Sequence, residues 1–371
     1  MRRMLLLSLT SLAVLAAQGV PARAGGASPR PASGTFLRAE LSTLLVFSGI
    51  TSSEGGRRFS PFPPLTPGAA FQLGEWVNGT PRAYPDRAWN GWRSGNDARA
   101  AFVGVNAIRI GPDGVLWVVD TGTRGLGRPT VPGGPKLVRI DVRANHVVRV
   151  YPLEHATRSN SYVDDVRFGE GRAYLTDAGA LGLIVLDLRS GQARRVLDAD
   201  RSVTQRRVLR GEGKPLRDPR GQPVRVNADQ IELSPDGRFL YHQPCTGPLY
   251  RIATRWLDDP APSDRERVRH VTLFASTGNT GGSAMDAAGN IYISDTDALA
   301  VRKITPQGRV STVVQDSRLV WVDAMWIDGQ GNLWLPANQL NRTRGLNGGV
   351  SALRPPLVIY RLPIGVRPLR R

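Results

Sequence analysis

Carboxylate and amide side chains recur at one position of a repeated sequence pattern. Counting back from the glycine of each repeated turn, that position holds Asn106, Asp164, Asp229, Gly281 and Asp323. Asp165 and Gln230 lie one residue further along and would take this place if the register shifted by one. Acidic side chains that are packed together repel one another and lose hydration, so they need raised pKa values or a bound cation. Because the set offers oxygen and neither imidazole nor thiolate, it favours a hard ion, Ca²⁺ before Mg²⁺.

These residues define a predicted binding site. The predicted metal ligands are Asn106, Asp164, Asp229 and Asp323, and the predicted ligand-binding set adds Asp165, Gln230 and Trp321. An aromatic wall beside carboxylates suits a cationic aromatic amine. Tyr162, Tyr241 and Trp326 are further candidates for that wall, although all these rings can instead fill the core. The aspartates have an alternative role as acceptors for turn amides around the axis. The pattern identifies no catalytic residue and predicts no organic cofactor.

Other residues give structural signals. Asp120, Asp177 and Asp295 each end the second strand of a repeat, where we expect a regular structural role. Cys245 is the only cysteine, so no internal disulfide can form, and we expect a small buried side chain near a strand end. The sequence contains no Gly-x-Ser-x-Gly elbow, and its four histidines have no partner at metal-ligand spacing.

The repeated pattern indicates the elements that must position these side chains. Each copy is a short apolar strand, a turn with glycine and a second strand that ends near aspartate, as in "GPDGVLWVVDTG" from Gly111. The turn glycines Gly114, Gly171, Gly237, Gly289 and Gly331 follow one another at intervals of 57, 66, 52 and 42 residues. Such intervals suit four-stranded antiparallel propeller blades. A less regular copy at 46–63, with Gly55 and Gly56 as its turn, makes six.

We therefore predict an all-β, six-bladed β-propeller. The C-terminal strand 356–364 is expected in the last sheet, and the way in which the ring closes stays open. In a propeller the innermost strands line the central channel. Polar residues at one register of these strands therefore converge on one small volume near the axis.

The beginning of the chain is typical of an export signal. A basic start precedes an apolar run from Leu5 to Ala17, and a small-residue site predicts cleavage after Ala24. The predicted organisation is a signal peptide at 1–24, a flexible N-terminus at 25–36 and a single propeller domain at 37–371. The predicted location is secreted or periplasmic, with an uncleaved membrane anchor as the alternative.

The formal net charge of +18 raises the question of a polyanionic partner. Only three of the 49 basic residues are lysines, and the arginines are scattered through every segment. The densest cluster, 201–225, is a loop by composition, and no recognition helix accompanies it. We therefore expect a monomer that binds a small molecule, with no nucleic-acid partner and no membrane span after signal cleavage.

Several motifs in order resemble the major royal jelly/yellow protein family. They are "VNAIRIGPDGVLWVVDTG", "PKLVRID", "SYVDDVRF" and "AYLTDAG", and the resemblance covers about residues 45–365. The resemblance implies that the protein is a bacterial-type member of this family and a secreted six-bladed propeller. The family includes binders of small molecules such as biogenic amines, nutritive or structural secreted proteins, and proteins linked to dopachrome conversion.

The wider superfamily contains calcium-dependent lactonases similar to gluconolactonase, in which a first-blade Glu, two Asn and an Asp hold the metal. Asp323 stands at the matching Asp position, and Asp229 stands where one of the asparagines is expected. The first-blade stretch 46–49 reads "VFSG" and has no glutamate. We therefore expect a small molecule, with or without Ca²⁺, at the mouth of the channel. The alternatives are a metal-dependent lactone hydrolase or dopachrome-tautomerase-like enzyme, and a non-catalytic scaffold for protein partners.

Overall fold

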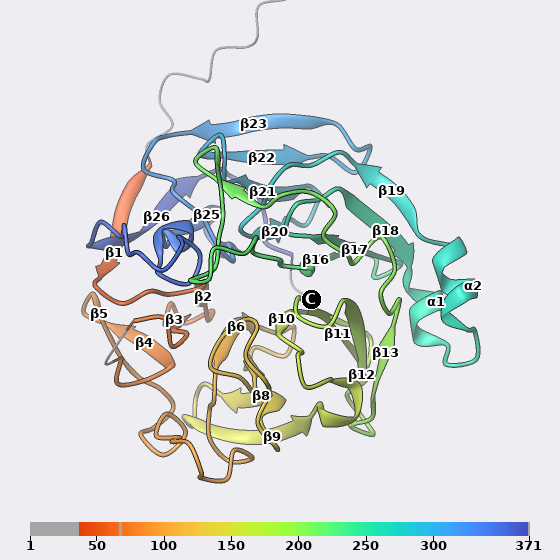
Figure 1. Cartoon of the computed structure of the whole chain (residues 1–371), viewed down its shortest axis with the longest axis horizontal. Coiled ribbons are helices and arrows are strands. Elements are labelled where there is room, and N and C mark those ends of the chain that lie inside the picture. The colour runs from red at the N-terminus through yellow and green to blue at the C-terminus, as the bar shows by residue number, and fades with distance from the viewer. Residues whose placement is uncertain (1–36, 67–68, 370–371) are drawn as a thin grey trace, which may run out of the picture. The chain divides into compact units, whose positions relative to one another are not determined.

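Six sheets of four antiparallel strands surround a central axis in the computed structural model, which describes residues 37–66 and 69–369 (Figure 1). This confirms the six-bladed propeller. The predicted signal peptide at 1–24 and flexible segment at 25–36 lie outside the described residues. No helix among the described residues is long and apolar enough to cross a membrane.

Each blade takes its strands from consecutive stretches of chain, apart from the last one. The first blade holds β2 (Thr51–Ser52), β3 (Arg58–Pro61), β4 (Leu73–Val77) and β5 (Thr80–Ala83). The second blade holds β6 (Val105–Ile110), β7 (Leu116–Thr121), β8 (Pro135–Asp141) and β9 (His146–Pro152). The third blade holds β10 (Val163–Gly169), β11 (Arg172–Asp177), β12 (Gly182–Asp187) and β13 (Ala193–Val196). The fourth blade holds β16 (Ala228–Leu233), β17 (Phe239–Pro244), β18 (Leu249–Ala253) and β19 (Thr272–Ala275). The fifth blade holds β20 (Ser283–Met285), β21 (Ile291–Asp295), β22 (Ala300–Ile304) and β23 (Val310–Gln315). The sixth blade holds β24 (Trp326–Ile327), β25 (Asn332–Ala337), β26 (Leu357–Pro363) and β1 (Arg38–Thr43).

The N-terminal strand closes the ring. β1 is the outermost strand of the sixth sheet and pairs with β26, with Leu41 opposite Ile359. The prediction that the C-terminal strand belongs to the last sheet is thus confirmed, and the open question of closure is answered. The N-terminal strand and the C-terminal strand of the propeller domain are therefore hydrogen-bonded neighbours in one sheet, which joins the first and last parts of the ring.

The turn glycines lie where the repeat placed them. Gly114, Gly171 and Gly237 have φ angles of +73°, +63° and +72°, a region that side chains with a Cβ avoid. Each turn joins the first to the second strand of its blade, on one face of the ring that we call the hairpin face. The starts of the first strands lie on the opposite face, which we call the strap face.

Apolar layers between neighbouring blades form the core. Trp117 of the second blade packs on Phe168 of the third, with ring centroids 4.8 Å apart. Asp120 supports this framework, since it accepts hydrogen bonds from the amides of Val103 and Gly104 and pairs with buried Lys136 at 2.6 Å. Asp177 accepts in the same way from the amide of Tyr162, and Asp295 accepts from the amide of Ala298 and pairs with Arg302 at 3.1 Å, so each of the three aspartates holds local structure.

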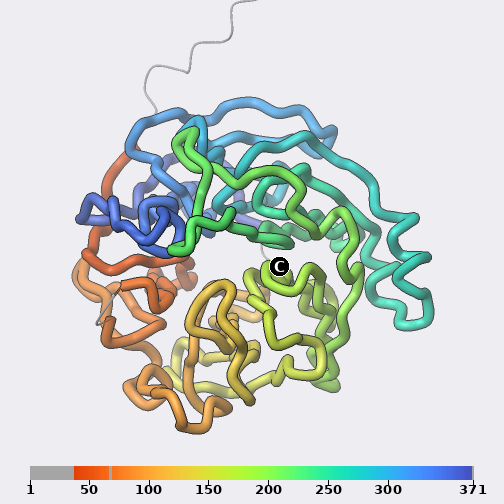
Figure 2. The backbone as a smooth tube through the Cα atoms, in the orientation of Figure 1, coloured from red at the N-terminus to blue at the C-terminus, as the bar shows by residue number. Residues whose placement is uncertain are grey.

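Two insertions depart from the repeat. Short helices α1 (Thr254–Asp258) and α2 (Asp264–Arg269) separate β18 from β19, and 3₁₀ turns occur at Glu154–Ala156 and Leu340–Arg342. A long connection between the third and fourth blades forms the small hairpin β14 (Arg210–Gly211) and β15 (Lys214–Pro215). We call residues 205–226 the strap. Figure 2 shows it crossing the ring toward the segment after β25, where the amide of Arg217 bonds to the carbonyl of Leu346 at 3.1 Å.

Candidate functional site

Irregular strand pairing sets the direction of the predicted site residues. The ladder between first and second strands shifts register between Val105 and Ala107, between Val163 and Val166, and between Ala228 and Ile231. Asn106, Asp164 and Asp229 lie inside these shifts, each on a different blade. A β-bulge places an extra residue on one strand and re-aims the side chains beside it. The bulges therefore direct these polar groups toward the axis instead of into the sheet.

Three carboxyl groups from three blades meet at the axis. We call Asp164, Asp229 and Asp323 the axial acid cluster. The carboxyls of Asp164 and Asp229 share a hydrogen bond, and the charge of Asp229 also acts on Asp323. Asp229 and Asp323 are partly exposed, whereas Asp164 is buried. The channel therefore brings together the carboxylates that the sequence pattern placed at one register.

Amide and phenol groups complete this cluster. The Asn106 amide donates to a carboxylate oxygen of Asp164, and the Tyr162 hydroxyl donates to Asn106 Oδ1 at 2.9 Å. Asp323 accepts from Asn338 Nδ2 at 2.6 Å and from the amide of Ala324 at 2.9 Å. Asn338 follows β25 at the end of the last repeat copy, and the sequence analysis did not single it out as a site residue.

Burial and mutual repulsion favour the protonated forms of these acids. Desolvation, followed by the charge of Asp229, raises the pKa values of Asp164 and Asp323 well above the ordinary range. Desolvation also raises the pKa of Asp229 to about 6, although hydrogen bonds from Asp164, Cys245 and Gln230 oppose the rise. Burial raises the pKa of Tyr162 as well, so its phenol stays neutral. The cluster therefore retains protons as long as no cation neutralises it.

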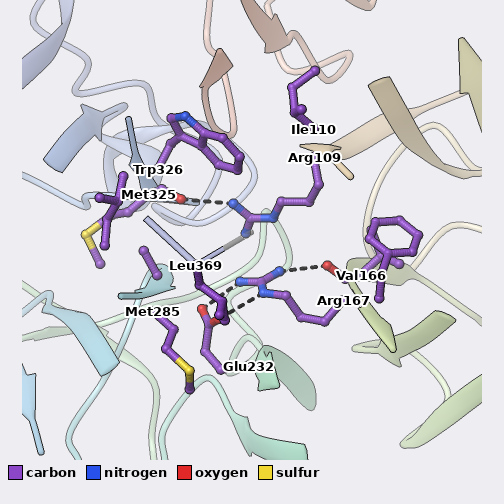
Figure 3. Close-up of a pocket in the computed structure, with 12 residues that line it drawn as sticks. Arg109, Ile110, Val166, Arg167, Glu232, Met285, Met325, Trp326 and Leu369 are labelled. Atoms are coloured by element: carbon purple, nitrogen blue, oxygen red, sulfur yellow. Dashed lines mark hydrogen bonds and ion pairs between the residues drawn. The ribbon is translucent and has the colours of Figure 1, made fainter. Parts of the chain in front are cut away.

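Asp165 points away from the cluster and into a buried ionic layer. Its carboxylate pairs with Arg109 and with Arg167, whose Nη1 lies 2.8 Å away, and Arg167 also pairs with Glu232 at 2.6 Å. Although burial alone would raise the pKa of Asp165, the two guanidinium groups hold it at about 2. Arg109, Arg167 and Glu232 line a cavity of about 50 Å³ together with Met285, Met325 and Leu369. Figure 3 shows Arg109, Arg167 and Glu232 pointing toward one another. Arg109, Arg167 and Glu232 follow Asn106, Asp164 and Asp229 by three residues on the same inner strands, so this layer lies nearer to the hairpin face than the acid cluster does.

The remaining predicted residues have other surroundings. Gln230 donates to the carbonyl of Thr280 at 2.9 Å and accepts from Gln243 at 3.0 Å, next to Asp229. Trp321 is buried in an apolar cluster with Cys245 and strap residues. At Gly281 a Cβ would lie 2.6 Å from the carbonyl oxygen of Val322, so the fifth blade contributes no side chain. Tyr241 and Trp326 lie in other clusters, and only Tyr162 of the proposed aromatic wall joins the carboxylates.

The strap forms a roof over this site. Leu209, Leu216 and Val224 pack against Cys245 and Trp321. Glu212 fastens the strap to the sixth blade, since it pairs with Arg342 at 2.6 Å and accepts from Asn341 Nδ2 at 2.8 Å. Cys245 is buried under this roof as expected, and desolvation followed by the Asp229 charge raises its thiol pKa.

Whether the axial acid cluster can bind a metal ion depends on which of its oxygen atoms are not already used in hydrogen bonds. Both carboxylate oxygens of Asp323 accept hydrogen bonds, and Asn106 Oδ1 accepts from Tyr162. Within residues 37–66 and 69–369, no group of three or more His, Cys, Asp or Glu side chains is arranged to hold a metal ion. Ca²⁺ needs six to eight oxygen ligands, so these side chains would have to exchange several hydrogen bonds to receive it. The calcium site stays a prediction.

The chain is similar in sequence to a known protein family and to several of its members. The family model described as major royal jelly protein matches residues 103–354. Protein yellow of Drosophila pseudoobscura pseudoobscura is 31% identical over 116 residues, and protein yellow of Drosophila subobscura is 30% identical over the same length. Each match covers 29% of this chain and 20% of the relative, so the similar region spans about a fifth of the length of these relatives.

Solved structures show the same fold at low identity. A putative gluconolactonase aligns with a TM-score of 0.55 and 13% identity over 91% of this chain and 95% of its own. A gluconolactonase from Xanthomonas campestris aligns with a TM-score of 0.53 and 13% identity over 90% of each chain. A luciferin-regenerating enzyme has a TM-score of 0.53 at 11% identity, covering 90% of this chain and 97% of its own. At such identities the likeness establishes the propeller architecture and no activity.

Proposed function

The chain belongs to the major royal jelly protein family, and on that premise we propose that it binds a small molecule bearing a positive charge at the axial acid cluster. The observation that carries the proposal is the convergence of Asp164, Asp229 and Asp323 from three blades, with raised pKa values. A cationic group takes the place of the protons that the cluster otherwise retains. Tyr162 supplies an aromatic ring beside the carboxylates, which suits an aromatic amine.

Proton release distinguishes this binding mode from adsorption to the surface. Because a bound cation favours the ionised carboxylates, it lowers their pKa values and expels protons. Isothermal titration with tyramine at pH 7, in two buffers of different ionisation enthalpy, measures the number of protons released. We expect saturable binding with net release. Binding without proton release, or no binding, would contradict the proposal.

Asp229→Asn tests the position of the site. Removing this carboxylate is expected to weaken tyramine binding by about tenfold or more, as for loss of a charged hydrogen-bond partner. Asp236→Asn is the matched control, because Asp236 lies on the hairpin face of the same blade and pairs with Arg238. Equal affinity in the two variants would place the amine elsewhere.

Calcium is the second way to neutralise the cluster. Titration with CaCl₂ in place of tyramine tests it, and Asp323→Asn should remove any calcium binding. Lactone hydrolysis has less support, because the first-blade stretch 46–49 supplies no carboxylate. It supplies Ser48, whose hydroxyl donates to the carbonyl of Asn106. Export remains part of the proposal, because the predicted signal peptide motivates it. If neither tyramine nor Ca²⁺ binds, the remaining candidate function is a non-catalytic scaffold for protein partners.

A further inference from the structure

A groove of about 420 Å³ lies on the hairpin face, at the end of the channel opposite to the acid cluster. Three blades and the C-terminal segment contribute to it. Its lining includes residues of the turns at 52–58, 110–114 and 326–330, together with Trp334, Pro368 and Leu369. The volume lies within the usual range for small-molecule sites. The buried layer of Arg109, Asp165, Arg167 and Glu232 lies between this groove and the axial acid cluster.

One side of the groove is apolar and fixed in orientation. Ile110, Trp326, Ile327 and Leu369 line it. The Trp326 indole is held by a hydrogen bond from its Nε1 to Ser52 Oγ at 3.0 Å, and the ring stays partly exposed. A partly exposed indole with a fixed edge offers a flat apolar surface to a ring. Figure 3 shows Trp326, Ile110 and Leu369 at the neighbouring inner cavity, which shares these residues with the groove.

The other side carries a positioned guanidinium group. Arg58 lies over the Trp334 ring with its Cζ 4.9 Å from the centroid, and Trp334 Nε1 is in turn fixed to Asp328 at 2.8 Å. Arg58 is half-buried, yet no group in the described part of the chain accepts a hydrogen bond from its guanidinium. The adjacent Arg57 differs, since it forms a two-point pair with Glu75 at 2.7 Å. Stacking therefore positions Arg58 and leaves its planar donors available.

The hydrogen bonds of Asp328, which also lines the groove, come from other groups. Asp328 accepts from the amides of Gln330 and Asn332, both at 2.9 Å, and from the side chains of Asn332 and Trp334. Although burial alone would raise the pKa of Asp328, these hydrogen bonds keep it below its ordinary value, so the carboxylate is ionised and satisfied. A guanidinium group held by stacking, as in Arg58, matches paired acceptor oxygens.

We propose that this groove binds a small organic carboxylate with a flat ring, the carboxylate on Arg58 and the ring on Trp326. A guanidinium fork matches a carboxylate in two-point geometry, and the apolar side covers the ring. The site is separate from the axial acid cluster and takes the opposite charge. It does not depend on the function proposed above.

Benzoate is the test probe, with benzyl alcohol and benzylamine as ring-matched controls of different charge. Titration is followed by the indole N–H signals of Trp326 and Trp334 in ¹H–¹⁵N spectra, assigned with Trp→Phe variants. We expect saturable shifts of both signals with benzoate, weaker ones with benzyl alcohol and none with benzylamine. Absence of saturation with benzoate, or equal shifts with all three probes, would overturn the proposal.

Variants locate the site. Arg58→Gln should weaken benzoate binding by about tenfold or more, and Arg58→Lys should retain only part of it, because lysine keeps the charge and loses the fork. Arg225→Gln is the matched control, since Arg225 is an exposed arginine on the strap. Asp229→Asn should leave benzoate binding unchanged, which separates this site from the channel mouth. Thermal melting of each variant establishes that it is folded. Binding that survives Arg58→Gln in a folded protein, or that is lost in Asp229→Asn, would show that the groove is not the site.

Discussion

At the scale of single residues, position within a bulge decides what each acid does. Asp164 and Asp165 are adjacent in sequence, yet Asp164 has a raised pKa in the axial acid cluster while Asp165, paired with two arginines, has a pKa of about 2. The difference arises because a register shift in β10 sends the two side chains to different layers of the channel. Residue type alone could not have separated them.

The raised pKa of Asp229 predicts a specific pH dependence of stability. The folded state binds a proton more tightly than the unfolded chain, so this contribution is present at low pH and is lost as pH rises from about 4 through about 6. Asp229→Asn removes the penalty and should increase the free energy of unfolding at pH 8 by on the order of 1 to 2 kcal/mol. Denaturant unfolding at pH 4 and pH 8 measures it. A variant less stable than the parent at pH 8 would contradict the assigned pKa.

The buried ionic layer gives a second prediction at this scale. Arg167→Met leaves Asp165 and Glu232 without a shared partner and should lower the free energy of unfolding by about 3 to 5 kcal/mol. Arg172→Met removes the half-exposed pair with Asp187 and should cost about 1 kcal/mol or less. Denaturant titration of both variants checks the difference. Similar losses would mean that the layer is no more important than a surface ion pair.

At the scale of elements, the strap covers Cys245, so the accessibility of this thiol reports on opening of the strap. The thiol lies beneath Leu209 and Leu216, so a maleimide can reach it only when the strap opens. Glu212→Gln weakens the attachment to Arg342 and should increase the labelling rate several-fold at fixed pH. Arg220→Gln, on an exposed part of the same strap, is the control and should leave the rate unchanged. Equal rates in both variants would show that Glu212 does not hold the roof.

The elements also mark the limit of sequence reasoning. The strands and their order followed from short runs of β-branched and aromatic residues and from turn glycines such as Gly114, whose φ of +73° explains the residue type. The strap was recognised only as a loop, because its role depends on contacts with residues more than a hundred positions away, such as Glu212 with Arg342. Asn338 was missed for the same reason, since it reaches Asp323 from the end of a different strand.

At the scale of the whole molecule, closure by β1 joins the two ends of the domain. The repeat pattern did not reveal this pairing, because an edge strand carries no turn of its own and its partner β26 lies more than 300 residues away. In a closed ring each blade packs against two neighbours, so the blades support one another around the circle. The position of the closing strand therefore affects stability far beyond its own six residues.

Leu41 tests this coupling. It is the buried residue of β1 and packs against Val46, Trp334 and Ile359. Leu41→Ala should lower the free energy of unfolding by about 2 to 4 kcal/mol, because it removes apolar contacts and loosens the strand that closes the ring. Leu44→Ala, at a position 71% exposed just beyond the strand, should change it by about 0.5 kcal/mol or less. Urea unfolding of the two variants provides the comparison. If Leu41→Ala is no worse than Leu44→Ala, the N-terminal strand does not secure the ring, and the acid cluster must be held together by the inner strands alone.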